Sequence, residues 1–261
     1  MYAMERQELV ERLLQDEGRV SVVDLARRFE VTTETIRRDL DRLEEAGRLR
    51  RVHGGAVALD RGSTAEPTLA ERLQRRGDAK TAIAARALRA LGSGFRGSVY
   101  IDAGTTTAAL AERLPAYLDA ANGRAEVVTH SMSIAAGLAG DAAVSLSVIG
   151  GRVRGVTAAA VGAHTLQSIS ELRPDVAFVG TNGLSAGFGL STPDPEEAAV
   201  KTAIVRAARR VVVLADATKF GEELLVRFAG LAEIDTLVSD AAPPVALETA
   251  LADADVEVVR A

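Results

Sequence analysis

The feature that most constrains this 261-residue chain is an alternation of two patterns from about residue 98 onward. Short apolar runs of the strand type occur at 99–102, 126–129, 144–149, 176–180, 211–215, 236–239 and 256–259. Segments of helical periodicity separate most of them, at 107–118, 131–139, 161–172, 196–209 and 245–253. Unbroken apolar strands that alternate with helices indicate a mainly parallel sheet covered on both faces. We therefore expect an α/β domain over residues 77–261.

The composition excludes several classes of protein. The chain contains no cysteine, which excludes disulfides, thiolate metal sites and cysteine nucleophiles. Its three histidines are widely separated and lack metal-ligand spacing. No run of roughly 18 uncharged apolar residues is present, and the first residues are charged and helical in pattern, unlike a secretory signal. We expect a cytoplasmic protein with no membrane segment, no metal and no other cofactor.

Ligands of parallel sheets bind beyond the carboxyl ends of the strands, so the segments that follow the predicted strands are candidates. The first is 102–107, Asp-Ala-Gly-Thr-Thr-Thr. Gly104 allows a tight turn, and Thr105, Thr106 and Thr107 offer hydroxyl and N–H groups at a helix N-terminus. Asp102 ends the strand before them. Such a loop is suited to an anion, although an ordinary capped turn explains it too.

Two further segments offer weaker candidates. Arg152 follows two glycines after the strand at 144–149 and has the charge to bind an anion. Thr181 and Asn182 follow the strand at 176–180 and carry groups that hydrogen-bond sugar hydroxyls. Turn chemistry explains Thr181 and Asn182 almost as well.

Lysine is rare in this chain, which draws attention to the places where it occurs. Of the 31 basic residues only Lys80, Lys201 and Lys219 are lysines, and a lysine suits a single phosphate oxygen. Lys201 follows Glu197 by four residues on a predicted helix, so a structural ion pair is the alternative to a ligand site. Lys219 follows Asp216 after another strand, and the two make a polar constellation at its carboxyl end.

The N-terminal part has a different pattern, that of three short helices and a hairpin. The first helix is expected at 5–16, with Leu9, Leu13 and Leu14 on its buried face, and the second follows an N-cap at Ser21. The third has an N-cap at Thr32, an apolar face and a glycine C-cap at Gly47. The apolar positions of this third helix are Ile36, Leu40 and Leu43.

This arrangement predicts a winged helix-turn-helix over residues 1–57. Polar side chains in the N-terminal half of the third helix are placed to meet base edges, and the basic hairpin is suited to DNA phosphates. An amphipathic helix with a solvated charged face is the alternative. The predicted DNA-binding residues are Thr33, Thr35, Arg37, Arg38, Arg48, Arg50, Arg51 and His53.

The stretch 31–57, VTTETIRRDLDRLEEAGRLRRVHGGAV, resembles the signature of the DeoR family of bacterial transcriptional regulators. DAGTTT, GLST–PEEAAVK and LADATKFG resemble that family's sensor domain, which is similar in fold to ribose-5-phosphate isomerase. Between the two regions, the small and polar run 58–66 and Pro67 predict a linker, and a linking helix follows, so that 58–76 joins the domains. The resemblance implies that a phosphorylated sugar binds near Asp102, Gly104, Thr105, Thr106, Thr107, Glu197, Lys201, Asp216 and Lys219. His130 stands where the family usually has Asn, so His130 is a further candidate for ligand selectivity.

These patterns predict a DNA-binding protein, and the resemblance implies a transcriptional regulator, a repressor of a sugar operon that a phosphorylated sugar or related metabolite releases. Double-stranded operator DNA is the expected partner. Residues 1–57 carry 11 Arg against 12 acidic residues, so one copy should bind DNA weakly, and we expect a homodimer or homotetramer. The alternative is an isomerase-like enzyme. In that case Glu197, Asp102 or Asp216 acts as a base and Lys201 or Lys219 polarises a carbonyl.

Overall fold

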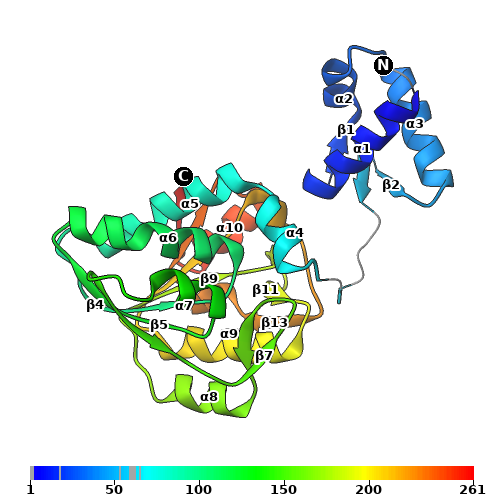
Figure 1. Ribbon diagram of the computed structural model, residues 1–261. Helices are drawn as coiled ribbons and strands as arrows, with labels where there is room; N and C mark the ends of the chain where they lie inside the picture. The colour runs from blue at the N-terminus through cyan, green and yellow to red at the C-terminus, as the bar shows by residue number, and fades with distance from the viewer. Residues whose placement is uncertain (1–2, 18, 53, 59–62, 65) are drawn as a thin grey trace. The chain divides into compact units, whose positions relative to one another are not determined.

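The computed structural model describes residues 3–17, 19–52, 54–58, 63–64 and 66–261 (Figure 1). The predicted DNA-binding residue His53 lies outside the described residues, as does the side chain of Arg50. The chain separates into two compact units, Met1–Ser63 and Thr64–Ala261. Each unit is described by itself. Within the described ranges, no helix combines the length and apolar character that crossing a membrane requires.

The first unit contains three helices and a small antiparallel sheet. The helices are α1 (Ala3–Glu17), α2 (Val22–Arg28) and α3 (Thr33–Glu45). The strands are β1 (Arg19–Ser21), β2 (Leu49–Val52) and β3 (Gly55–Ala58), in the order β1-β3-β2. The fold is thus the predicted winged helix-turn-helix, and β1 is a strand that the sequence pattern did not predict.

The core of the first unit identifies the buried face of α1. Val10 and Leu14, one helical turn apart, are buried together with Ile36 and Leu40 of α3. Leu9 is exposed, so its prediction as a buried residue was wrong. The leucine pattern of α1 fits two neighbouring faces, and Val10 with Leu14 is the pair that packs against α3.

The second unit is built on a seven-stranded sheet in which every neighbouring pair is parallel. The strand order is β15-β14-β12-β9-β4-β5-β6. Their bounds are β4 (Arg96–Ile101), β5 (Arg124–Thr129), β6 (Val144–Val148), β9 (Val176–Gly180), β12 (Val211–Leu214), β14 (Thr236–Ser239) and β15 (Glu257–Arg260). Because all seven strands run the same way, their carboxyl ends lie along one edge.

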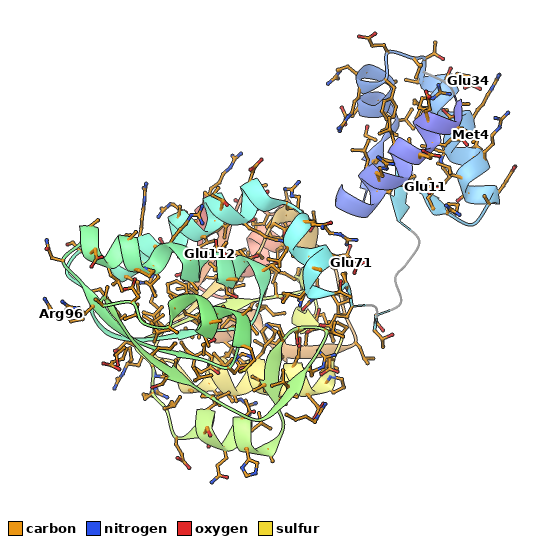
Figure 2. The ribbon with its side chains drawn as sticks, in the orientation of Figure 1. Met4, Glu11, Glu34, Glu71, Arg96 and Glu112 are labelled. Atoms are coloured by element: carbon orange, nitrogen blue, oxygen red, sulfur yellow. The ribbon has the colours of Figure 1, made fainter. Side chains whose placement is uncertain are left out.

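Helices cover both faces of this sheet, as Figure 1 shows. One face packs against α5 (Gly77–Leu88), α6 (Thr105–Ala120) and α7 (Met132–Leu138), and the other against α8 (Ala163–Ser170), α9 (Pro195–Ala207) and α10 (Val245–Asp253). In β9, Val176 and Phe178 point to the first face and Ala177 and Val179 to the second. Polar side chains such as Arg96 and Glu112 lie at the surface (Figure 2). This is the predicted α/β architecture.

Smaller elements surround the large sheet. A hairpin consists of β7 (Arg152–Arg154) and β8 (Ala159–Val161), and a second antiparallel sheet of β10 (Gly183–Ser185), β11 (Gly189–Thr192) and β13 (Val226–Ala229). The sequence pattern predicted none of these strands. Short helices complete the unit: α4 (Leu69–Gln74), η1 (Arg89–Leu91), η2 (Ala217–Lys219) and η3 (Leu231–Glu233).

The segment 66–76, called the connector below, precedes α5 and contains α4. Thr68 caps α4 through a capping box with Glu71. The amide of Leu69 donates to the carbonyl oxygen of Val156 at 3.0 Å. The connector therefore packs as part of the second unit, and the boundary between the two units falls within the predicted linker.

Candidate effector site and DNA-reading helix

The third helix begins and ends as its sequence predicts. The Thr32 hydroxyl accepts from the amide of Thr35 at 3.2 Å. At the other end, Gly47 has φ +65°, its amide donates to the Glu44 carbonyl at 2.8 Å, and the next amide donates to the Leu43 carbonyl at 2.8 Å. This is the Schellman arrangement, which glycine accommodates without strain.

Arg37 and Arg38 are exposed cations in the N-terminal half of this helix. Their guanidinium groups lie 3.8 and 3.5 Å from the Glu34 carboxylate, and all three side chains are more than half exposed. Such exposed pairs are weak, so both arginines remain available to another partner. Thr33 is exposed beside them, whereas the Thr35 hydroxyl is 2.9 Å from that of Thr32.

Two predicted DNA-binding arginines have partners within the unit. Arg51 donates to the carbonyl oxygen of Arg37 at 3.1 Å and pairs with Asp41, which fixes β2 against α3. Arg48 pairs with Glu11 at 3.0 Å, and this hydrogen bond raises the pKa of Arg48. The structure therefore sets Arg51, which holds β2 against α3, apart from Arg37, Arg38 and Arg48, whose side chains are more than half exposed.

A buried ion pair in this unit escaped the sequence analysis. Asp39 lies in the middle of α3, is 3% exposed, and accepts from Arg6 at 2.5 Å and from Gln7 at 3.0 Å. Because its partners come from α1, Asp39 orients the first helix against the third. The available sequence signal was its spacing, three residues after Ile36 and four before Leu43, which places this acid on the apolar face of α3.

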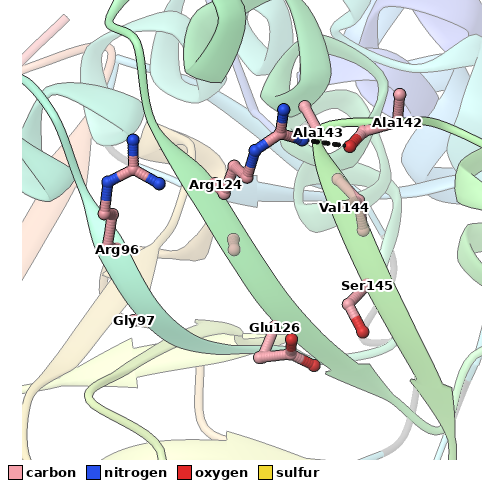
Figure 3. Close-up of a pocket in the computed structure, with 9 residues that line it drawn as sticks. Arg96, Gly97, Arg124, Glu126, Ala142, Ala143, Val144 and Ser145 are labelled. Atoms are coloured by element: carbon pink, nitrogen blue, oxygen red, sulfur yellow. Dashed lines mark hydrogen bonds between the residues drawn. The ribbon is translucent and has the colours of Figure 1, made fainter.

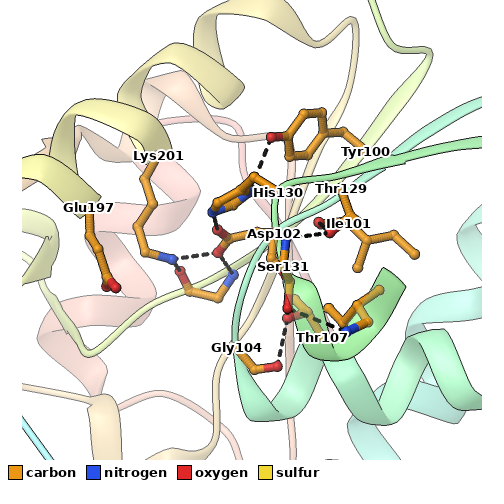
Figure 4. Close-up of polar contacts among 12 residues, drawn as sticks. Tyr100, Ile101, Asp102, Gly104, Thr107, Thr129, His130, Ser131, Glu197 and Lys201 are labelled. Atoms are coloured by element: carbon orange, nitrogen blue, oxygen red, sulfur yellow. Dashed lines mark hydrogen bonds and ion pairs between the residues drawn. The ribbon is translucent and has the colours of Figure 1, made fainter. Parts of the chain in front are cut away.

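In the second unit, several predicted side chains meet at the carboxyl end of the sheet (Figure 4). Asp102 follows β4 and is completely buried. Its Oδ2 pairs with Nζ of Lys201 from α9 and accepts from the amide of Gly180 at 2.9 Å. Lys201 also donates to the Gly180 carbonyl at 2.9 Å and lies 5.5 Å from the centre of the Phe228 ring. The segments that carry Asp102, Gly180 and Lys201 are far apart in the sequence and thus meet at one buried ion pair.

The other oxygen of Asp102 faces His130. Oδ1 is buried and without a hydrogen-bond partner among the described residues, and it lies 3.8 Å from Nε2 of His130. That distance is too long for a hydrogen bond. A carboxylate disfavours a lone pair opposite it, so Nε2 carries the proton. Nδ1 then accepts from the Tyr100 hydroxyl at 3.1 Å.

The protonation of this group follows from its burial. Burial lowers the pKa of His130 below its usual 6.5, and Lys201 lowers it further, while Asp102 and Glu197 oppose the shift. Burial also raises the pKa of Tyr100 well above its ordinary value, and Asp102 adds to that effect. His130 and Tyr100 are therefore neutral beside a buried ion pair at neutral pH.

The loop before α6 divides the predicted threonines by role. Thr107 is buried, and its hydroxyl donates to the carbonyl oxygens of Asp102 at 2.7 Å and Gly104 at 3.0 Å. Thr105 is buried as well, whereas Thr106 is half-buried. Gly104 is the N-cap of α6, and no side chain caps this helix. The N-terminus of α6 therefore keeps amides that an anion can use.

The ion-pair partner of Glu197 is Arg154. An ion pair with Lys201 was the structural alternative, but Glu197 accepts from Arg154 of β7 at 2.6 Å. The same guanidinium pairs with Asp194 at 3.1 Å and with Glu66 of the connector at 2.8 Å. Arg154 is 14% exposed and links the connector to the first turn of α9. No sequence pattern distinguished Arg154 from the other arginines.

Three other predicted residues bind neighbouring groups of the protein. The Thr181 hydroxyl donates to the carbonyl oxygens of Gly183 at 2.6 Å and Ser191 at 3.2 Å, and Asn182 Oδ1 accepts from Thr192 at 3.0 Å. These contacts favour the turn interpretation of Thr181 and Asn182. Arg152 pairs with Glu196 at the surface.

Asp216 and Lys219 lie together after β12, apart from the Asp102 group. Burial alone would raise the pKa of Asp216, but Lys219, hydrogen bonds from Thr218 and the charge of Arg76 hold it below its usual value. Lys80 of α5 is buried nearby and acts electrostatically on the same two residues. The predicted site residues thus form two groups at one edge of the sheet.

A cavity of about 530 Å³ lies elsewhere, at the amino ends of β4, β5 and β6 (Figure 3). Its lining includes Arg96, Arg124, Glu126 and Ser145, and Arg124 donates to the carbonyl oxygen of Ala142 at 2.5 Å. None of the predicted effector residues lines it. The rule that ligands bind at the carboxyl ends of parallel strands therefore directs attention away from this cavity.

Comparisons with known proteins agree with this architecture. The DeoR-like helix-turn-helix domain matches residues 6–62, and the DeoR C terminal sensor domain matches residues 75–241. The chain is 34% identical to the uncharacterized HTH-type transcriptional regulator FruR of Bacillus subtilis, over 92% of each chain. It is 32% identical to the glycerol-3-phosphate regulon repressor of Escherichia coli, again over 92% of each chain.

Among solved structures, ribose 5-phosphate isomerase A of Methanocaldococcus jannaschii matches with a TM-score of 0.41 and 16% identity. That match covers 55% of this chain and 54% of the isomerase. The regulators, by contrast, match along nearly the whole chain and are named as regulators or repressors, not enzymes. The chain therefore belongs to the DeoR family of DNA-binding transcriptional regulators, through both its helix-turn-helix unit and its sensor unit.

Proposed function

We propose that this regulator represses a sugar-related operon and that a phosphorylated sugar or polyol releases it from its operator. The observation that carries the proposal is the buried acceptor Oδ1 of Asp102, which has no partner among the described residues and faces Nε2 of His130 at 3.8 Å. A relative of similar length is named as a glycerol-3-phosphate regulon repressor, which supports this class of effector.

The chemistry of these groups supports a hydroxylated ligand. A hydroxyl group accepts one hydrogen bond and donates another, so it can accept from His130 and donate to Asp102. The buried pair with Lys201 fixes the orientation of Asp102. The uncapped N-terminus of α6 supports a further acceptor oxygen on the same ligand, because its first amides have no side-chain cap.

The burial of this group supports a coupling between ligand binding and conformation. Asp102, His130 and Lys201 are each at most 4% exposed, so a ligand reaches them only when neighbouring segments move. A ligand that prefers the moved arrangement shifts the population toward it. In this proposal, the shifted population holds DNA less well.

The DNA-reading part of the proposal concerns Arg37 and Arg38. Both are exposed near the N-terminal half of α3, where a recognition helix contacts base edges. Two copies of the chain, in a homodimer or homotetramer, place two such helices on two half-sites. Paired binding is needed because a single near-neutral head has little attraction for DNA phosphates.

The effector proposal is tested by fluorescence anisotropy on a labelled fragment from upstream of the gene. The protein–DNA complex is titrated with sugars and polyols, each with and without phosphate, sn-glycerol 3-phosphate included. We expect a phosphorylated compound to release the DNA. Thr106→Ala should weaken that response while leaving DNA affinity intact. The matched control is Ser168→Ala, which removes an exposed hydroxyl on α8. Release by unphosphorylated sugars alone, or by none of the compounds, contradicts the proposal.

The DNA contacts are tested separately with Arg37→Ala and Arg38→Ala. Loss of a base-reading arginine should cost about 1–3 kcal/mol and relax the sequence preference. The control is Arg12→Ala, which removes an exposed cation from α1. An equal loss on every DNA sequence would make these arginines phosphate contacts, and an unchanged affinity would remove them from the interface.

A further inference from the structure

The junction between α4 and α5 contains a group of basic side chains that the proposed site does not use. Lys80 of α5 is 7% exposed, and its ammonium donates to the carbonyl oxygens of Arg72 and Arg75 in the connector, the latter at 2.6 Å. Arg76, the next connector residue, pairs with Asp240 after β14. Because α4 packs against α6, this junction lies on the side of the sheet where the proposed effector loop begins.

Positive charge is in excess at this junction. Burial lowers the pKa of Lys80 to about 8, Asp216 raises it, and Lys219, Arg72 and Arg75 lower it further. Within the described part of the chain, one carboxylate, that of Asp216, and three cations act on Lys80. Asp240 is already engaged by Arg76 and by the amide of Ala217 at 2.8 Å. Asp216 and Asp240 thus interact with a larger number of cations, namely Arg72, Arg75, Arg76, Lys80 and Lys219.

Two guanidinium groups at this junction also carry an N–H donor that has no acceptor among the described residues. Nε of Arg72 and Nε of Arg76 are buried atoms with no hydrogen-bond partner in the described part of the chain. A buried N–H that lacks an acceptor costs free energy, which an oxyanion can recover. Arg72, Arg76, Lys80 and Lys219 are called the junction cluster below.

We propose that the junction cluster is an anion site that takes the phosphate group of the effector. The identification of this anion with the effector's phosphate rests on the proposed function. The connector then contributes ligand-binding side chains itself, since Arg72 and Arg76 both belong to it. Ligand binding would therefore act directly on the segment that leads to the DNA-binding unit, with no relay through the sheet.

The test uses the full-length protein without DNA, so it is independent of operator binding. Inorganic sulfate is titrated by calorimetry at pH 8, at constant ionic strength, in two buffers of different ionisation enthalpy. Sulfate does not titrate at this pH, so any proton taken up binds to the protein. A group of pKa about 8 is half protonated there, so sulfate beside Lys80 should drive uptake of up to about half a proton.

Variants decide between the junction cluster and other surfaces. Lys80→Met should abolish the proton uptake. Lys219→Met changes a half-buried position, which is safer for folding, and should lower the affinity for sulfate about tenfold. The matched control is Arg89→Gln, an exposed cation at the far end of α5, which should change neither. Equal sulfate affinity in all three variants, or no binding of sulfate or inorganic phosphate to the wild-type protein, overturns the proposal.

Discussion

Replacement of Lys201 by methionine is the sharpest test of the buried polar group. The Lys201 and Asp102 side chains are 5% and 0% exposed, so the substitution leaves a buried carboxylate whose remaining close donor is the amide of Gly180. Breaking a buried ion pair by removing one partner costs about 3–5 kcal/mol. We expect Lys201→Met to lower the free energy of unfolding by roughly this amount at pH 8.

His130 makes that loss depend on pH. Lys201 lowers the pKa of His130, so its removal should raise that pKa, and a protonated ring 3.8 Å from Asp102 replaces part of the lost charge. Burial should still lower the pKa of His130 in the variant, but the pKa should be less depressed than in the wild type. As pH falls below the unfolded pKa of 6.5, the variant should therefore lose less stability than the wild type. The defect of Lys201→Met should therefore be smaller at pH 6 than at pH 8.

Urea unfolding followed by tyrosine fluorescence measures this effect, because the chain has no tryptophan, and Tyr100 and Tyr117 lie in the sensor unit. The double variant Asp102→Asn/Lys201→Met is the control. It removes both charges and should recover much of the lost stability. A loss below about 1 kcal/mol at pH 8, or a defect that grows on acidification, would refute the assigned role of the pair.

Three further predictions concern single positions. Thr107→Val removes a buried hydroxyl that serves two carbonyl oxygens, and should cost about 1–2 kcal/mol in urea unfolding. Gly47→Ala places a side chain at φ +65° and should lower the stability of the first unit by about 1 kcal/mol, measured by its thermal transition. Gly77→Ala, at the start of α5, should not have this effect. His130→Asn should become more stable relative to wild type as pH falls below 6.5, because the depressed pKa of His130 makes its contribution disappear there. Parallel pH titrations of unfolding would show equal slopes if this is wrong.

The parts of the fold that follow from periodicity were predictable. The strands at 176–180 and 236–239 and the helix at 245–253 have the predicted bounds, because apolar runs and helical periods specify them locally. The hairpin of β7 and β8 and the sheet of β10, β11 and β13 were missed. Their strands are only three or four residues long and carry no alternation that a sequence pattern could detect.

The location of the candidate site could be predicted from the sequence, but most contacts among its side chains could not. The parallel-strand rule pointed to Asp102, the rarity of lysine to Lys201 and the family resemblance to His130, and the structure joins the three. Sequence could not assign the partner of Glu197, because Arg154 approaches it from a hairpin that had not been predicted. It could not separate Arg51 from Arg37 either, since the contact between them depends on how the wing folds back on α3.

The strand order of the large sheet has a consequence for synthesis on the ribosome. The first unit is complete within 63 residues. In the large sheet, by contrast, β4 pairs with β9, which emerges about 75 residues after β4 ends. One edge of that sheet is β15, at residues 257–260. Domains that emerge first generally fold first. During translation the DNA reader is therefore finished long before its sensor, and a prematurely terminated chain would yield a reader that no metabolite can control.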